Sequence, residues 1–434
     1  MASVKPGRAP LNHGTDAAMD AGRGKTLSRE ALCLWGLLML ASTRLYAIHA
    51  VRGELFQPTP DLTYQAAVLG FNYFELGSIR RGLGGSIAYL LSRDPFVAAG
   101  LFHLLSAAAV AAVAAWWFAR LDAPPLRRGA FLMVMLAIML RWAEDAGRTD
   151  MLVAASIGLA SIALARQRLA WAVASLGVGL LVHETAFIFG VPLIVALLMQ
   201  PGAWASFDAP ARLRAAFAFV VSLAAYLALN EWPHADPATM ARVVAAKFAP
   251  SPYVDWAIYF AISGTRSLAT NLCQNANDPS YWLHPTGGVL VLALAGFALS
   301  RRLRSEWGPA LVATLPAFAF LSVITNDISR WAMFACFNLW LVLIAAHRPG
   351  DADAASPRWA FAVALLLLPL TSAKLGVGET PIYSPAPLLE RIAQKRFGVP
   401  YTPTFHQVLD RCDPTWRDLF GPAAPPATAA PPPR

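Results

Sequence analysis

Charged residues are scarce in this chain of 434 residues: 14% of its residues are charged, whereas 57% are hydrophobic. The mean hydropathy is +0.48. A water-soluble globular domain carries about 25% charged residues, so this composition excludes an ordinary soluble domain. It predicts an all-α fold in the form of a polytopic bundle of transmembrane helices.

The motifs of soluble catalytic folds are also missing. The chain has no P-loop, no nucleotide-binding fingerprint, no Gly-x-Ser-x-Gly elbow and no His-Glu-x-x-His zinc motif. The net charge of +9 does not indicate nucleic acid, because lysine and arginine concentrate in short loops between apolar segments. Such loops mark the cytoplasmic face of a membrane protein. The sequence therefore predicts membrane lipid as a partner, and no nucleic acid.

Apolar segments recur along most of the chain, and a full span needs about 20 apolar residues. Residues 29–375 are predicted to form the transmembrane bundle, with interfacial helices in the extracytoplasmic loops 51–94 and 231–285. Residues 1–28 are predicted to be a disordered cytoplasmic tail, and residues 376–434 an extracytoplasmic tail that is disordered at its Pro-rich end. The eleven candidate spans, some of them short or broken, are 31–50, 95–118, 130–141, 150–165, 170–182, 185–199, 213–230, 286–300, 308–325, 331–346 and 359–373.

Loops on alternate sides of these segments differ in charge. One side receives loops rich in arginine: Arg120, Arg127, Arg128, Arg166, Arg168, Arg212, Arg214, Arg301, Arg302, Arg304, Arg348 and Arg358. The other side receives the loops that mix acids, histidine and arginine. This distribution follows the positive-inside rule, so it predicts a cytoplasmic N-terminus and an extracytoplasmic C-terminus.

The first polar cluster lies in the loop 51–94. Asp61 precedes an aromatic stretch that contains Glu75, and Arg80 and Arg81 then lead into a glycine-rich segment. Two guanidiniums beside a flexible glycine turn predict a binding site for phosphate or pyrophosphate, because arginine offers bidentate donors. The alternative is a glycine hinge whose arginines snorkel to lipid headgroups.

The second cluster, Arg141 to Asp150, holds three acids and two arginines within ten residues at a membrane boundary. Asp145 and Asp150 together predict ligands for a divalent cation, Mg or Mn, or an acid and a base. Arg148 between them is a candidate phosphate ligand. The alternative is a self-neutralising turn in which Asp150 stabilises the N-terminus of the following helix.

The third and fourth clusters are shorter. His183 and Glu184 follow the segment 170–182, which covers about 20 Å against about 30 Å of hydrocarbon. A broken span of this kind is tolerated where its end lines a wet, protein-enclosed cavity, and tilt in a thin bilayer is the alternative. Asp327 and Arg330 are three residues apart, so they could pair on one helix face. They are predicted either to contact substrate or to close a tight turn, with Asp327 as the N-cap of the helix 331–346.

The chain has four cysteines. Cys33 and Cys336 fall inside apolar segments and are interpreted as packing residues. Cys273 and Cys412 both fall in segments assigned to the extracytoplasmic side, where disulfides persist. A bridge between Cys273 and Cys412 would tie the C-terminal tail onto the loop 231–285; two free thiols are the alternative, because cysteines that share a compartment need not be neighbours.

In order and position, these polar motifs resemble those of bacterial envelope-polysaccharide membrane proteins related to the GT-C class of glycosyltransferases. The resemblance rests on Asp61, the aromatic stretch and Arg80–Gly85, then Gly147–Asp150, His183-Glu184 with Pro192 downstream, and Asp327–Trp331. It implies a protein of the bacterial cytoplasmic (inner) membrane that transfers sugar from a polyprenyl-phosphate donor to a glycan or lipid acceptor on the extracytoplasmic side. A polysaccharide polymerase or ligase using the same donors, and a proton-coupled transporter, are the alternatives.

The resemblance and the clusters together assign roles. The catalytic candidates are Asp61, Glu75, Asp150, His183 and Glu184. The substrate-binding candidates are Arg80, Arg81, Arg148, Asp327 and Arg330, and an optional metal would lie at Asp145 and Asp150. Because charges isolated in lipid are costly, we expect these side chains to surround one cavity that faces outward.

Overall fold

The computed structural model describes residues 27–51, 55–56, 60–79, 81–121, 125–143, 148–200, 203–231, 236–262, 268–273, 303–324, 328–346, 405–416 and 418. All regular structure in these ranges is helical, in sixteen elements, with no strand. The predicted all-α class is therefore confirmed for the described part of the chain.

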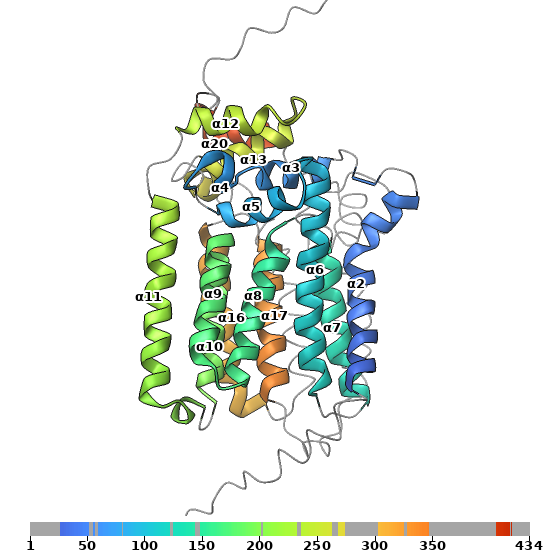
Figure 1. The fold of residues 1–434 in the computed structure, drawn as a ribbon, viewed down its shortest axis with the longest axis vertical. Helices are drawn as coiled ribbons and strands as arrows, with labels where there is room; N and C mark the ends of the chain where they lie inside the picture. Colours follow the sequence, from blue (N-terminus) through green and yellow to red (C-terminus); the bar gives the residue numbers. More distant parts are fainter. Residues whose placement is uncertain are drawn as a thin grey trace, which may run out of the picture.

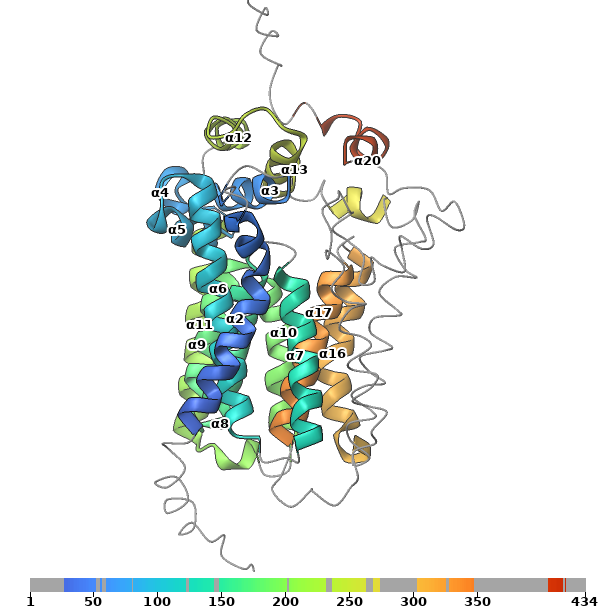
Figure 2. The same cartoon turned by 90° about the vertical axis from the view of Figure 1, so that its right-hand side faces the viewer.

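Nine of the described helices run side by side as the body of the molecule (Figures 1 and 2). They are α2 (Leu27–Val51), α6 (Pro95–Ala119), α7 (Pro125–Ala143), α8 (Asp150–Ala165), α9 (Leu169–Val182), α10 (Thr185–Leu198), α11 (Ala209–Glu231), α16 (Leu303–Ile324) and α17 (Ile328–Ala346). Each coincides with one predicted span. The other two predicted spans, 286–300 and 359–373, lie outside the described residues.

Two of the described helices are long and apolar enough to cross a membrane: α6 and, within α11, the stretch Ala209–Leu229. Helices α8, α9 and α10 have 16, 14 and 14 residues, so each is about 21–24 Å long. The predicted number of spans, about eleven, stays a prediction.

A layer of short helices covers one end of the bundle, which we call the cap end (Figure 1). It comprises α3 (Pro60–Leu69), α4 (Tyr73–Leu76), α5 (Gly82–Leu91), α12 (Pro237–Ala245), α13 (Pro252–Ile262) and α20 (Phe405–Cys412). The loops 51–94 and 231–285 therefore contain the short helices predicted for them. Buried apolar side chains join the two loops, among them Ala67, Phe71, Val244 and Ile258.

A disulfide bond joins Cys273 to Cys412, so the two thiols are not free. It fastens α20 to the segment that follows α13, 139 residues earlier in the chain. Next to it, the Tyr259 hydroxyl donates a hydrogen bond to Asp413 (2.9 Å), and Leu409 and Trp416 pack around Tyr259. The C-terminal helix is therefore part of the cap rather than a separate tail.

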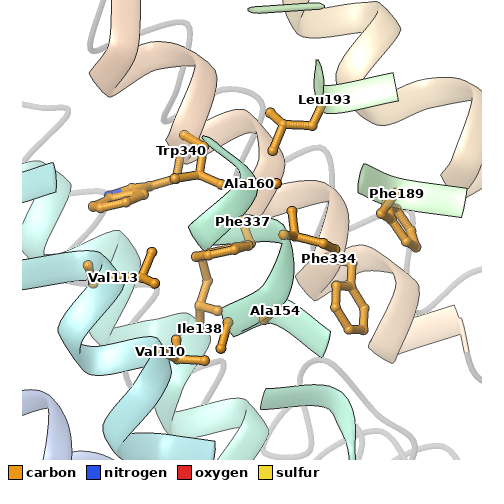
Figure 3. Close-up of a cluster of buried hydrophobic side chains, with 14 of the residues drawn as sticks. Val110, Val113, Ile138, Ala154, Ala160, Phe189, Leu193, Phe334, Phe337 and Trp340 are labelled. Atoms are coloured by element: carbon orange, nitrogen blue, oxygen red, sulfur yellow. The ribbon is translucent and has the colours of Figure 1, made fainter. Parts of the chain in front are cut away.

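The core of the bundle contains aromatic, aliphatic and small side chains packed together (Figure 3). Phe334, Phe337 and Trp340 of α17 face Ala154 and Ala160 of α8, with the other labelled side chains around them. Alanine at these positions allows the large rings to be buried without displacing the helices. Replacing a buried phenylalanine with alanine would cost about 3–5 kcal/mol.

One asparagine joins three helices in this core. The Nδ2 atom of Asn338, on α17, donates hydrogen bonds of 2.8 Å to the carbonyls of Phe189 on α10 and Ala313 on α16. Both carbonyls lie three residues before a proline inside a helix, Pro192 and Pro316. A proline lacks the donor for the carbonyl four residues before it, so each accepting carbonyl lies next to the one that the proline leaves without its helical donor, and Asn338 supplies a hydrogen bond to each of these two disturbed turns.

Candidate functional site

Arg81 begins the helix that brings the glycine-rich segment onto the bundle. It adopts the left-handed conformation, with φ 61°, which is uncommon for a residue with a side chain. The glycines after it belong to α5 and are buried. A Cβ on Gly84 would lie 3.1 Å from Thr149 Cγ2, and one on Gly85 would lie 2.0 Å from the carbonyl oxygen of Phe71.

These contacts correct the prediction of a flexible glycine turn. The glycines are in the first turn of a helix, where only the absence of a side chain allows α5 to approach its neighbours so closely. A Cβ on Gly84 would also lie 3.7 Å from Val182 Cγ1, at the end of α9. Helix α5 therefore packs directly on the first residues of α8 and the last residues of α9.

The helical conformation is interrupted between α9 and α10 at His183, whose backbone is extended (φ −168°, ψ 138°). Its Nδ1 atom accepts a hydrogen bond from the backbone N–H of Thr185 (3.2 Å) and lies 2.6 Å from the Thr185 hydroxyl oxygen. His183 thus fills the role that serine or aspartate has at many helix N-termini, where a side chain satisfies an unpaired backbone donor.

Glu184, inside this break, joins three elements. Arg81 Nε donates a hydrogen bond of 2.7 Å to Glu184 Oε2, and the Tyr226 hydroxyl on α11 donates one of 3.1 Å to Oε1. His183 Nδ1 lies 3.6 Å from Oε2. The Glu184 side chain is 17% exposed and that of Arg81 is 39% exposed, so the arginine remains accessible from outside the bundle.

A second ion pair joins α8 to α17. Arg330 Nε donates a hydrogen bond of 2.6 Å to Asp150 Oδ1, and the side chains are 11% and 4% exposed. Asp150 is the first residue of α8, where the helix dipole also favours a negative charge. The Arg330 guanidinium lies 4.7 Å from the centre of the Trp331 ring. Sequence reasoning considered Asp327 as the partner of Arg330 and did not indicate Asp150, 180 residues away.

Glu75 lies in the cap, where it binds Lys247 and accepts a 2.5 Å hydrogen bond from Asn72 Nδ2. Burial raises the pKa of this carboxyl, but hydrogen bonds from Lys247 and Asn72, with the charges of Lys247 and Arg93, outweigh burial and lower the pKa below 4.5. Glu75 is therefore ionised at neutral pH, and it fastens α4 to the residues that follow α12.

The structure places the predicted residues unequally. It brings Arg81, His183 and Glu184 together. Helix α5, which follows Arg81, also packs on Thr149 at the start of α8, and the next residue, Asp150, binds Arg330. Arg148 is partly exposed two residues before Asp150, and Asp61 is on α3, although its side chain is outside the described set. Arg80, Asp145 and Asp327 fall outside the described residues.

The predicted metal site has limited support from the residues that the structure describes. None of their His, Cys, Asp and Glu side chains form a group of three or more suited to a metal ion. Asp150, the described half of the predicted pair, accepts from Arg330. Tyr226 and Lys247 were missed by sequence reasoning, because a single tyrosine in an apolar helix and a single lysine in a loop carry no distinguishing pattern.

Comparison with protein-family models, with curated proteins and with solved structures found no match for this chain.

Proposed function

We propose that the bundle lies in a membrane, with the cap on the extracytoplasmic side and the N-terminus in the cytoplasm. Large apolar side chains are exposed along the bundle, for example Leu213 and Phe217 of α11, at 73% and 70%. The disulfide is in the cap, which suits an oxidising compartment. Arginines gather at the opposite end, after α6, α8 and η1 (Trp204–Ser206), which suits the cytoplasm.

Within that frame we propose that the protein is an inverting glycosyltransferase that uses a polyprenyl-phosphate sugar to build an envelope glycan. The observation that carries this proposal is the pair Arg81–Glu184, which couples the cap helix α5 to the break between two short bundle helices. It puts an accessible, strained arginine above the end of a broken span, where a lipid-linked phosphate would enter from the bilayer. Strained backbone of this kind clusters at functional sites.

The chemistry follows from these positions. The acceptor hydroxyl would attack the anomeric carbon and lose its proton to a carboxylate, while the bond from that carbon to the phosphate oxygen breaks. Arg81, with Arg148 and Arg80, would hold the departing phosphate. Asp61 is the preferred base, because the lowered pKa of Glu75 makes Glu75 a weaker one. Glu184 would orient Arg81 rather than take the proton, and Mg or Mn at Asp145 and Asp150 stays optional.

Two other functions remain as candidates. A polysaccharide polymerase or ligase would use the same donors and the same arginines. A proton-coupled transporter is favoured by one observation, the Asp150–Arg330 pair, since buried pairs of this kind occur on ion and substrate paths through membranes.

The test is sugar transfer by the purified full-length protein, with a panel of radiolabelled polyprenyl-phosphate sugars and mixed glycan and lipid acceptors. We expect product with the wild-type protein and at least a 100-fold slower reaction with Arg81→Ala, since a phosphate ligand contributes to transition-state stabilisation. Arg242→Ala on α12, another cap arginine, is the matched control and should react normally. Absence of transfer with the whole panel, together with proton-dependent uptake into proteoliposomes, would identify a transporter instead.

A further inference from the structure

The end of the bundle opposite the cap, which we call the basic end, contains an arrangement that the proposed sugar transfer does not use. The guanidinium carbon of Arg120 lies 3.7 Å from the centre of the Trp116 ring, and that of Arg166 lies 5.4 Å from the same centre. Both arginines are exposed. They come from different helices, since Arg120 ends α6 and Arg166 ends α8.

The two arginines are held in place by the helices beneath them. Trp117 Nε1 on α6 donates a buried hydrogen bond of 2.9 Å to Ser161 Oγ on α8, which fixes the register of the two helix ends. Arg120 also donates from Nη1 to the Trp116 carbonyl (3.3 Å). The ring of Trp116 therefore has two guanidiniums beside it in a set geometry.

The turn that carries Arg166 is itself well defined. The N–H of Arg168 bonds to the carbonyl of Ala163 (2.8 Å), and that of Gln167 bonds to Leu164 (2.9 Å), which is the pattern of a Schellman turn. Gln167 takes the left-handed position, with φ 58°, and its Oε1 accepts a 2.7 Å hydrogen bond from Ser206.

We propose that Arg120, Arg166 and Trp116 form a binding site for the headgroup phosphate of an anionic phospholipid. A guanidinium that stacks on an aromatic ring presents its edge away from the ring, and arginine binds phosphate through that edge. Two such groups on one ring are complementary to a phosphodiester whose negative charge no headgroup cation neutralises, and basic pockets on the cytoplasmic side of membrane proteins bind anionic headgroups.

Lipid is favoured over a soluble anion by the surroundings. Trp171 and Trp204 are 66% and 48% exposed at the same end, and the Arg212 guanidinium lies 4.5 Å from the Trp204 ring centre. Exposed tryptophans at one level of an apolar bundle are typical of the membrane–water interface. Helix α6 carries Trp116 in its last turn and is followed by Arg120. It is one of the two described helices with the length and hydropathy of a membrane span.

The site rests on insertion of the bundle in a membrane, and it does not depend on sugar transfer. Its test is lipid retention by the full-length protein in a neutral detergent, measured by native mass spectrometry with equal amounts of phosphatidylglycerol and chain-matched phosphatidylcholine. We expect the wild-type protein to prefer phosphatidylglycerol. Each arginine near an anionic surface contributes about fivefold, so Arg120→Gln with Arg166→Gln should lower the preference about 25-fold.

The matched control removes the same charge elsewhere. Arg93→Gln with Arg242→Gln changes two cap arginines, one of which lies 3.5 Å from the centre of the Tyr89 ring, and should keep the preference. Arg120→Lys with Arg166→Lys keeps the charge but loses the planar guanidinium and its bidentate donors, so its preference should lie between that of the wild-type protein and that of the double glutamine variant. If the double glutamine variant does not fold, Arg166→Gln alone should give about a fivefold loss.

Four results would overturn the site: equal retention of the two lipids by the wild-type protein, an unchanged preference in the glutamine variants, an equal loss in the control, or full preference in the lysine variant. Release of phosphatidylglycerol by millimolar inorganic phosphate would identify a site for a free anion instead. Because Arg81 is unchanged in every variant, loss of lipid binding and loss of sugar transfer can be told apart.

Discussion

At the cap end, Arg81 and Arg330 each bind a carboxylate from a distant part of the chain, whereas at the basic end Arg120 and Arg166 lie on one indole ring. The first arrangement pairs each arginine with a carboxylate and joins separate helices. The second gathers two exposed cationic side chains around one aromatic ring. The same residue type therefore serves tertiary structure at one end and, in our proposal, attraction of lipid at the other.

The largest expected effect comes from the buried pair at the cap end. Arg330→Ala would leave Asp150 as an uncompensated buried charge, and breaking one side of a buried pair costs about 3–5 kcal/mol. The measurement is the free energy of unfolding in detergent. Arg128→Ala at the basic end is the control, because its partner Glu30 is 63% exposed, and an exposed pair contributes about 0–1 kcal/mol.

A double variant tests whether the loss of stability comes from an unpaired charge or from the lost contact between Asp150 and Arg330. Asp150→Asn with Arg330→Met removes both charges, and it should recover much of the stability lost in Arg330→Ala, because the cost of the single change is an unpaired buried carboxylate. Equal losses in Arg330→Ala and Arg128→Ala would mean that the two ends do not differ in the way proposed.

The second effect, somewhat smaller, is confined to the cap. Cys273→Ser with Cys412→Ser removes a link across 139 residues, and loss of a disulfide typically costs about 2–4 kcal/mol. Hydrogen exchange should speed up in α13 and α20, while the turn between α8 and α9 at the basic end should keep its protection. Cys33→Ser is the control. Faster exchange at both ends would show that the cap and bundle open as one unit.

A third prediction concerns acid. The folded-state pKa of Glu75 is lowered, so its contribution to stability is present above about pH 4.5, the ordinary value, and is lost as pH falls through the folded pKa. Glu75→Gln should cost about 1 kcal/mol at pH 7, and should reduce the fall in stability of the wild-type protein at acidic pH. The check is unfolding midpoints of both proteins from pH 3 to pH 7. The same acid sensitivity in both would exclude Glu75 as its source.

Sequence reasoning identified the elements of this molecule better than their contacts. Within the described residues, nine apolar segments are helices as predicted, because hydrophobic length is a local property. Assigning Cys273 and Cys412 to one side made their bridge possible, and only the fold shows that the two residues meet. The break at His183 was indicated by a span too short to cross alone. The pair Asp150–Arg330 was missed because nothing local selects a partner 180 residues away.

For the glycines of α5, the sequence pattern was recognised, but the prediction of a flexible turn was wrong. A Gly-rich sequence indicates either flexibility or close packing, and only the three-dimensional surroundings, such as the carbonyl of Phe71 beside Gly85, distinguish the two. The partner of Glu75 was missed for a similar reason, since Lys247 lies 172 residues further along the chain. Local patterns thus predicted where polar groups occur, and packing decided which of them meet.

The smallest expected effect is in the turn at the basic end. Gln167 has a positive φ, a conformation that glycine adopts at less cost, but its side chain accepts a hydrogen bond from Ser206. In the wild-type protein, Gln167→Gly should change stability by less than about 0.5 kcal/mol, because relief of strain and loss of the bond offset each other. In a Ser206→Ala background the bond is already gone, so the same change should stabilise by about 0.5–1 kcal/mol. Ala163→Gly, in the last turn of α8, is the control and should destabilise by about 1 kcal/mol in either background. If Gln167→Gly were destabilising in the Ser206→Ala background, the rigid turn that holds Arg166 would depend on another contact of the Gln167 side chain.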